Sequence, residues 1–120
     1  MSKILVAEDN LPTRELIREI LEACGYDVIE AVDGQQALDK LEQDLPDLVL
    51  LDIQMPILDG YAVVRKLRQT PRLAKLKVLA LTAYAMQGDR EKVLQAGFDG
   101  YLTKPVDFVS LSKQIAQLLQ

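Results

Sequence analysis

The sequence has charged and polar residues directly after short apolar segments, and their types suit the handling of a phosphoryl group. These residues are Glu8, Asp9, Asp52, Thr82 and Lys104. Clustered carboxylates repel one another unless a cation neutralises them, and oxygen ligands without imidazole or thiolate favour magnesium. A lysine and a hydroxyl on the opposite side could hold the remaining oxygens of a dianionic phosphate. We therefore predict a magnesium-dependent phosphoryl site, in which manganese could replace magnesium.

Asp52 is the predicted phosphate acceptor of this site. It stands alone after a central apolar run, whereas Glu8 and Asp9 are adjacent and suited to holding the ion. Covalent aspartyl phosphate is an established type of intermediate. The sequence contains neither a GxxxxGKS/T phosphate loop nor a GxGxxG turn, so a nucleoside triphosphate is not the expected donor. Because the chain has no histidine, we expect a phosphohistidine on another protein to supply the phosphoryl group.

The composition indicates one domain over residues 1–120 and excludes several functional classes. The chain has 120 residues, of which 49% are hydrophobic, and its net charge is −4. The lack of histidine excludes an imidazole base and a Ser/His/Asp triad, and the acidic balance makes direct nucleic-acid binding unexpected. The single cysteine, Cys24, excludes an internal disulfide. No apolar run approaches the roughly 20 residues of a membrane span, so we expect a cytoplasmic protein without membrane contact.

The elements that must position these residues follow from the hydrophobic pattern. Short apolar runs predict fully buried strands at residues 4–7, 48–51 and 78–81. Less apolar segments at residues 27–31 and 100–103 are further strand candidates. Apolar residues at helical spacing predict five helices. They are marked by Leu16, Ile17, Ile20, Leu21 and Cys24; by Ala37, Leu38 and Leu41; by Tyr61, Val64, Leu67 and Arg68; by Asp89 to Ala96; and by Phe108, Leu111, Ile115 and Leu118. Alternating strands and helices predict an α/β fold with a parallel sheet, whose carboxyl ends bring the polar residues to one edge.

Turn and capping residues agree with these boundaries. Pro12 suits the first turn of a helix, and Gly25 and Gly97 stand where helices should end. Asp33-Gly34 is typical of a turn before a helix, and Asp59-Gly60 is typical of a turn or an N-cap.

The chain resembles the receiver domains of two-component response regulators, the CheY-like family, from Lys3 to Leu119. Four segments carry the resemblance in the same order as in the family: VAEDN at residues 6–10, LLDIQMPILDG at 50–60, LTA at 81–83 and YLTKP at 101–105. The resemblance implies a flavodoxin-like (βα)5 three-layer sandwich whose parallel strands have the order 2-1-3-4-5. It also implies a phosphorylation-dependent switch that catalyses only its own phosphorylation and dephosphorylation and is not otherwise an enzyme.

The resemblance assigns roles to the acidic cluster and its lysine. Asp52 would accept the phosphoryl group and, with Asp9, would bind Mg²⁺ directly. Glu8 would hold the ion mainly through water, and the main-chain carbonyl of Gln54 would complete the protein ligands. Lys104 would pair with Asp52 and then with the phosphoryl group.

The resemblance also implies the residues that respond to phosphorylation. Thr82 and Ala83 would bind phosphate together with the lysine, and Thr82 would move with the aromatic switch residue Tyr101. A cis peptide bond is expected before Pro105. Gln54 and Tyr84 match positions that tune dephosphorylation.

The implied partners are proteins. A sensor histidine kinase or a histidine phosphotransfer protein would be the donor, and a downstream protein would contact the fourth helix, the fifth strand and the fifth helix. We expect a monomer or a phosphorylation-dependent dimer. The segment from Ala83 to Asp89 is similar to hybrid-kinase receivers and single-domain DivK-type regulators. We expect a stand-alone receiver, with a receiver excised from a longer protein as the alternative.

Three other functions fit the sequence less well. A haloacid-dehalogenase-type hydrolase would need a DxDxT pattern, but Ile53 and Gln54 follow Asp52. A receiver-shaped scaffold that works without phosphorylation would not need the intact set of site residues. Flavodoxin-like cofactor binding would need a phosphate-cradling loop after the first strand, and the sequence has none there.

Overall fold

The computed structural model describes residues 2–83 and 89–120 and has the predicted alternation of strands and helices. The elements are β1 (Lys3–Ala7), α1 (Leu11–Ala23), β2 (Asp27–Ala31), α2 (Gly34–Gln43), β3 (Leu48–Asp52), α3 (Gly60–Gln69), β4 (Lys77–Thr82), α4 (Asp89–Ala96), β5 (Gly100–Thr103) and α5 (Phe108–Leu119). The strands form one parallel sheet with the order β2-β1-β3-β4-β5. The predicted fold class and strand order are therefore confirmed. Asp52 and Thr82 are the last residues of their strands, so both strands end one residue later than predicted.

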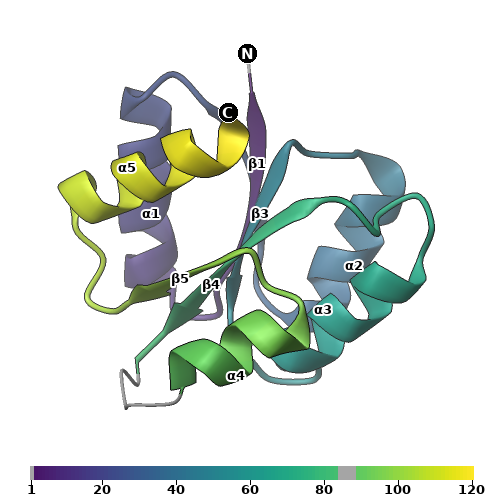
Figure 1. Cartoon of the computed structure of the whole chain (residues 1–120). Coiled ribbons are helices and arrows are strands. Elements are labelled where there is room, and N and C mark those ends of the chain that lie inside the picture. The colour runs from purple at the N-terminus through teal and green to yellow at the C-terminus, as the bar shows by residue number, and fades with distance from the viewer. Residues whose placement is uncertain (1, 84–88) are drawn as a thin grey trace.

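Helices cover both faces of the sheet, which makes three layers. Helices α1 and α5 lie on one side, and α2 and α3 lie on the other (Figure 1). Successive residues of a strand point to opposite faces. Accordingly, Ile4 of β1 packs in the core under α1 and α5, whereas Leu5 packs under α2 and α3. Val93 joins α4 to the second of these cores. Because both faces are covered, every residue of β3 is buried, as the continuous apolar run predicts.

Asparagine and aspartate side chains fix the beginnings of four helices. The caps Asn10, Asp33, Asp59 and Asp107 each accept a hydrogen bond from the main-chain N–H three residues later. Asp59 thus has one of the two roles predicted for the Asp59-Gly60 pair, whereas Asp33, for which a turn was predicted, is the N-cap of α2. Gly25 follows α1 with a φ of +91°, a conformation that glycine adopts without strain.

The first and last helices bury less of their predicted stripes than expected. Leu16 of α1 is 43% exposed, and Phe108 of α5 is 52% exposed. Leu16 is one position, or about 100° of helical rotation, from the buried Ile17 and so lies at the margin of the stripe. Phe108 is the first residue of α5, before the buried Leu111. Cys24 is the C-cap of α1 and is partly buried.

The beginning of α3 is held tightly against the end of β3. The main-chain N–H of Gly60 donates a hydrogen bond of 2.8 Å to the carbonyl of Ile53. A Cβ atom at residue 60 would lie only 2.7 Å from the main-chain oxygen of Asp52. Glycine is therefore required here, and this close contact fixes the backbone that carries Asp52. None of the helices within the described ranges is both long and apolar enough to cross a membrane.

Candidate functional site

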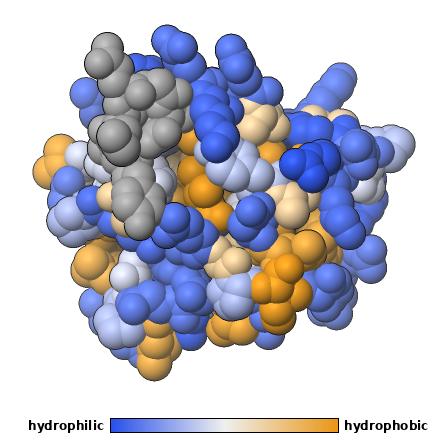
Figure 2. All heavy atoms as spheres, turned by 90° about the horizontal axis from the view of Figure 1, so that it is seen from below, coloured by the Kyte–Doolittle hydropathy of each residue, from blue (hydrophilic) through white to orange (hydrophobic). Residues whose placement is uncertain are grey.

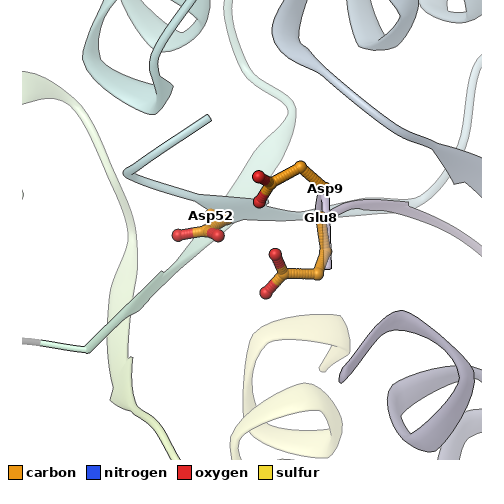
Figure 3. A group of neighbouring side chains, drawn as sticks. All are labelled: Glu8, Asp9 and Asp52. Atoms are coloured by element: carbon orange, nitrogen blue, oxygen red, sulfur yellow. The ribbon is translucent and has the colours of Figure 1, made fainter. Parts of the chain in front are cut away.

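Three carboxylates converge at the edge where the parallel strands end. Glu8 and Asp9 follow β1 directly, and Asp52 ends the neighbouring strand β3 (Figure 3). One oxygen from each residue can be chosen so that all three lie within 4.8 Å of one another. Glu8 is fully buried and Asp52 is 2% exposed, whereas Asp9 is exposed to solvent. The cluster therefore combines buried charge with one side that is open to ligands.

Lys104 provides the positive charge that faces this cluster. Its Nζ lies 3.0 Å from Oδ2 of Asp52 and 2.6 Å from Oε1 of Glu8. Burial acts to lower the pKa of Lys104, but its contacts with Glu8 and Asp52 outweigh that effect and raise the pKa above its usual value. The lysine is therefore a permanent cation beside the predicted phosphate acceptor.

Glu8 has the most strongly perturbed acid group in the cluster. Burial raises its pKa to about 7, and the nearby Asp52 carboxylate acts in the same direction. The ammonium of Lys104 and the main-chain N–H of Asn10 oppose this rise. A cation bound beside Glu8 would favour the ionised carboxylate, so the raised pKa is consistent with a cation site at this position.

Thr82 and Tyr101 line a pocket of about 160 Å³ that also includes Gln54. Thr82 is buried at the end of β4, which pairs with β3. The main-chain N–H of Lys104 donates to the carbonyl of Thr82 at 2.8 Å, and that of Gln54 donates to Oδ1 of Asp52 at 3.0 Å. The residues predicted for phosphate binding and switching thus adjoin the acidic cluster.

The remaining predictions for this edge have mixed outcomes. Ala83 follows Thr82 directly and is exposed. The peptide bond between Lys104 and Pro105 is cis, as predicted. Tyr84 lies outside the described residues.

Arg14 of α1 is a residue of this site that the sequence did not indicate. Its Nη1 donates a 2.9 Å hydrogen bond to the main-chain carbonyl of Glu8, and its Nε pairs with Glu30 of β2 at 3.0 Å. Arg18 pairs with the other carboxylate oxygen of Glu30 at 3.2 Å. The arginine therefore connects β2 and α1 to the backbone of the acidic pair. The spacing from Glu8 to Arg14 carries no motif that would have revealed it.

The donor set fits a hard divalent cation. Three carboxylates face one ammonium group, which leaves an excess of negative charge, and all candidate side-chain ligands are oxygens. Magnesium favours such ligands and retains several waters. Figure 2 views this end of the molecule, where hydrophilic residues cover most of the surface between apolar patches. Because Asp9 is exposed at this end, the site is open to water and to a charged ligand.

Comparison with known proteins identifies the family. The model of the response regulator receiver domain matches residues 4–116. The polar-differentiation response regulator DivK of Brucella anthropi is 39% identical over 103 residues, which cover 86% of this chain and 84% of that protein.

Solved structures of receiver domains resemble this chain in fold and in sequence. The receiver domain of a sensor histidine kinase from Pseudomonas aeruginosa, which has a magnesium ion coordinated in its active-site cleft, is 37% identical with a TM-score of 0.91 and covers 98% of this chain and 97% of its own. A chemotaxis CheY protein of Vibrio cholerae is 28% identical with a TM-score of 0.93, covering 99% of both chains. The chain belongs to the response regulator receiver domain family of two-component signalling.

Proposed function

We propose that this receiver domain accepts a phosphoryl group on Asp52 from a phosphohistidine of a sensor kinase or phosphotransfer protein. The observation that carries the proposal is the position of Asp52, which is buried and lies 3.0 Å from the ammonium of Lys104 and beside two further carboxylates. Buried charged groups that are gathered in this way are typical of functional sites.

The proposed transfer needs no acid or base from this chain. A carboxylate oxygen of Asp52 attacks the phosphorus atom, and the bond from phosphorus to the donor's imidazole nitrogen breaks. The imidazole leaves with the bonding electrons and takes a proton from solvent. Asp9, Asp52 and the carbonyl of Gln54 would hold Mg²⁺, with Glu8 acting through water. When bound, this ion neutralises negative charge on the phosphoryl oxygens.

The other site residues would hold the product. Lys104, which pairs with Asp52 before transfer, would pair with a phosphoryl oxygen afterwards. Thr82 and the N–H of Ala83 would donate hydrogen bonds to the remaining oxygens. These contacts exist only in the phosphorylated state, and a ligand shifts an equilibrium only through such differential contacts.

The proposed output is a protein contact. Tyr101 of β5 lines the same pocket as Thr82, so a change at Thr82 can reach the surface formed by α4, β5 and α5. We propose that a downstream protein in the cytoplasm binds this surface. The domain would be a monomer, or it would dimerise on phosphorylation. Light scattering before and after phosphorylation distinguishes the two states of assembly.

Labelling with acetyl [³²P]phosphate tests the proposal. We expect Mg²⁺-dependent labelling of the wild type and none of Asp52→Asn. The matched control is Asp39→Asn, which neutralises an exposed carboxylate on α2 away from the site. Undiminished labelling of Asp52→Asn would refute the assignment, and equal loss in Asp39→Asn would show that the effect is not specific to the site.

A further inference from the structure

Charge is distributed very unevenly along this acidic chain. Residues 1–59 contain 14 acidic and 4 basic residues, whereas residues 60–120 contain 4 acidic and 10 basic residues. Six of the basic residues lie between Asp59 and Asp89, a stretch with no acidic residue at all. The chain therefore carries a strongly basic region despite its net charge of −4. A concentration of one sign of charge attracts partners of the opposite sign.

Part of this basic region surrounds a groove between α3 and α4. Its first hollow, of about 520 Å³, has Arg65 and Lys92 in its lining. Its second, of about 580 Å³, has Lys75 and Lys77 in its lining. The hollows adjoin, because Ala96 lines the first and the next residue, Gly97, lines the second. We call the two hollows together the α3–α4 groove.

The four groove cations are available for a partner. Arg65, Lys75, Lys77 and Lys92 are exposed, and none lies within 4.0 Å of an acidic side-chain oxygen in residues 2–83 and 90–120. Lys92 lies over the ring of Tyr61, with 5.1 Å between its Nζ and the ring centroid. Unpaired surface cations can exchange water for the carboxylates of a partner at low cost.

Arg68 has a different role, because it forms the base of the groove. Its guanidinium donates to the carbonyls of Gly97, Ala74 and Leu76 and pairs with Asp99 at 2.9 Å. Asp99 also accepts a hydrogen bond of 2.8 Å from the N–H of Val78. The acidic residue that lines the groove is therefore already engaged, which leaves the four exposed cations uncompensated.

We propose that the α3–α4 groove binds an acidic polypeptide segment of a partner protein. Carboxylates of the segment would pair with the four cations, and an apolar side chain would cover Leu94, which is 41% exposed in the second hollow. A nucleic acid fits less well, since the groove offers no exposed aromatic ring for base stacking: Phe98 is 4% exposed and Tyr61 is partly buried. The excess of acidic residues in the first half of the chain would also repel a long polyanion.

The groove adjoins the phosphorylation pocket, and this second step rests on the proposed function. Tyr61 and Lys92 line both the first hollow and the pocket that contains Thr82. A segment that binds against these two side chains therefore alters one wall of the pocket that contains Thr82 and Tyr101. Because coupling between two sites is reciprocal, phosphorylation of Asp52 would in turn change the affinity of the groove.

Fluorescence anisotropy with a labelled synthetic peptide, in which glutamates flank two leucines, tests the binding. The groove variant is Arg65→Gln/Lys75→Gln/Lys77→Gln, and the matched control is Lys66→Gln/Arg72→Gln/Lys113→Gln. Both variants remove three exposed cations, so their net charges are equal. Because three exposed ion pairs with the peptide would be lost, we expect about tenfold weaker binding by the groove variant and less than about twofold change in the control.

Three results would overturn the assignment. Equal weakening in both variants would mean that the peptide responds to net charge alone. Equal binding of a peptide with glutamine in place of glutamate would exclude charge recognition. Tighter binding of a single-stranded oligonucleotide of equal charge would favour nucleic acid. Circular dichroism confirms that each variant is folded.

A separate measurement tests the coupling. The anisotropy titration is repeated with protein treated with acetyl phosphate and Mg²⁺, and the affinity of the wild type for the peptide should differ from that of the untreated protein, whereas Asp52→Asn should show no difference. Equal affinities of the phosphorylated and unphosphorylated wild type would disprove the coupling. If Asp52 is not labelled at all, the proposed function fails, while the anisotropy result still decides whether the groove binds the peptide.

Discussion

Replacing Glu8 with glutamine should stabilise the metal-free protein at alkaline pH. Burial beside Asp52 raises the pKa of Glu8 from 4.5 to about 7, so the folded protein resists ionisation of this group. Each pKa unit corresponds to about 1.36 kcal/mol, which gives a penalty of about 3 kcal/mol for the ionised form. The variant Glu8→Gln cannot ionise and avoids this penalty.

The pH at which the effect develops follows from the direction of the shift. The folded state binds the Glu8 proton more tightly than the unfolded chain does. The contribution of protonated Glu8 to the free energy of unfolding is therefore fully present below about pH 4.5, and it is lost as the pH rises through about 7. We expect Glu8→Gln to exceed the wild type by about 3 kcal/mol at pH 8 and by less than about 1 kcal/mol at pH 5.

Urea unfolding in EDTA, followed by circular dichroism at pH 5 and pH 8, measures this difference. The matched control is Glu42→Gln, which alters an exposed glutamate of α2 and should show little pH dependence. Saturating Mg²⁺ should reduce the advantage of Glu8→Gln, because a cation that binds the folded wild type more tightly than the folded variant stabilises the wild type more. An advantage that is the same at both pH values would refute the reasoning about Glu8.

Two further variants test the support of the site. Arg14→Met should weaken Mg²⁺ binding about tenfold, as measured by isothermal titration calorimetry, because the side chain no longer holds the backbone of Glu8. Arg18→Met removes a side chain that pairs with Glu30 and Glu22 and should leave the Mg²⁺ affinity nearly unchanged. Equal losses in both variants would contradict a positioning role for Arg14. Gly60→Ala should lower the free energy of unfolding by about 1–3 kcal/mol, because the added Cβ would lie 2.7 Å from the main-chain oxygen of Asp52. Urea unfolding measures the change. A variant as stable as the wild type would show that the backbone relaxes to accept the added atom.

The sequence predicted the fold and much of the candidate site because both depend on strands. Continuous apolar runs identify strands that are buried on both faces, and parallel strands end at one edge. The residues that follow such runs must therefore meet, and Glu8, Asp52 and Lys104 do so. Which residues meet at this edge depends on the strand ends and not on side-chain packing, so it can be predicted from the sequence.

Features that depend on packing between helices could not be predicted in this way. Arg14 reaches the carbonyl of Glu8 only because α1 lies against the sheet, and its spacing along the chain resembles that of any surface arginine. Likewise, Arg68 lies on α3 in a stripe that the sequence presents as apolar, yet it bonds to Gly97, 29 residues away. Such contacts join segments that are distant in the sequence, and a single sequence contains no signal for them.

The central claim is that Asp52 carries the phosphoryl group. Its most direct test is borohydride reduction of protein treated with acetyl phosphate and Mg²⁺, followed by peptide mass spectrometry. Reduction converts a phosphorylated aspartate to homoserine, so we expect homoserine at position 52 when Mg²⁺ is present and not in its absence. Homoserine at another position, or none despite incorporated phosphate, would contradict it.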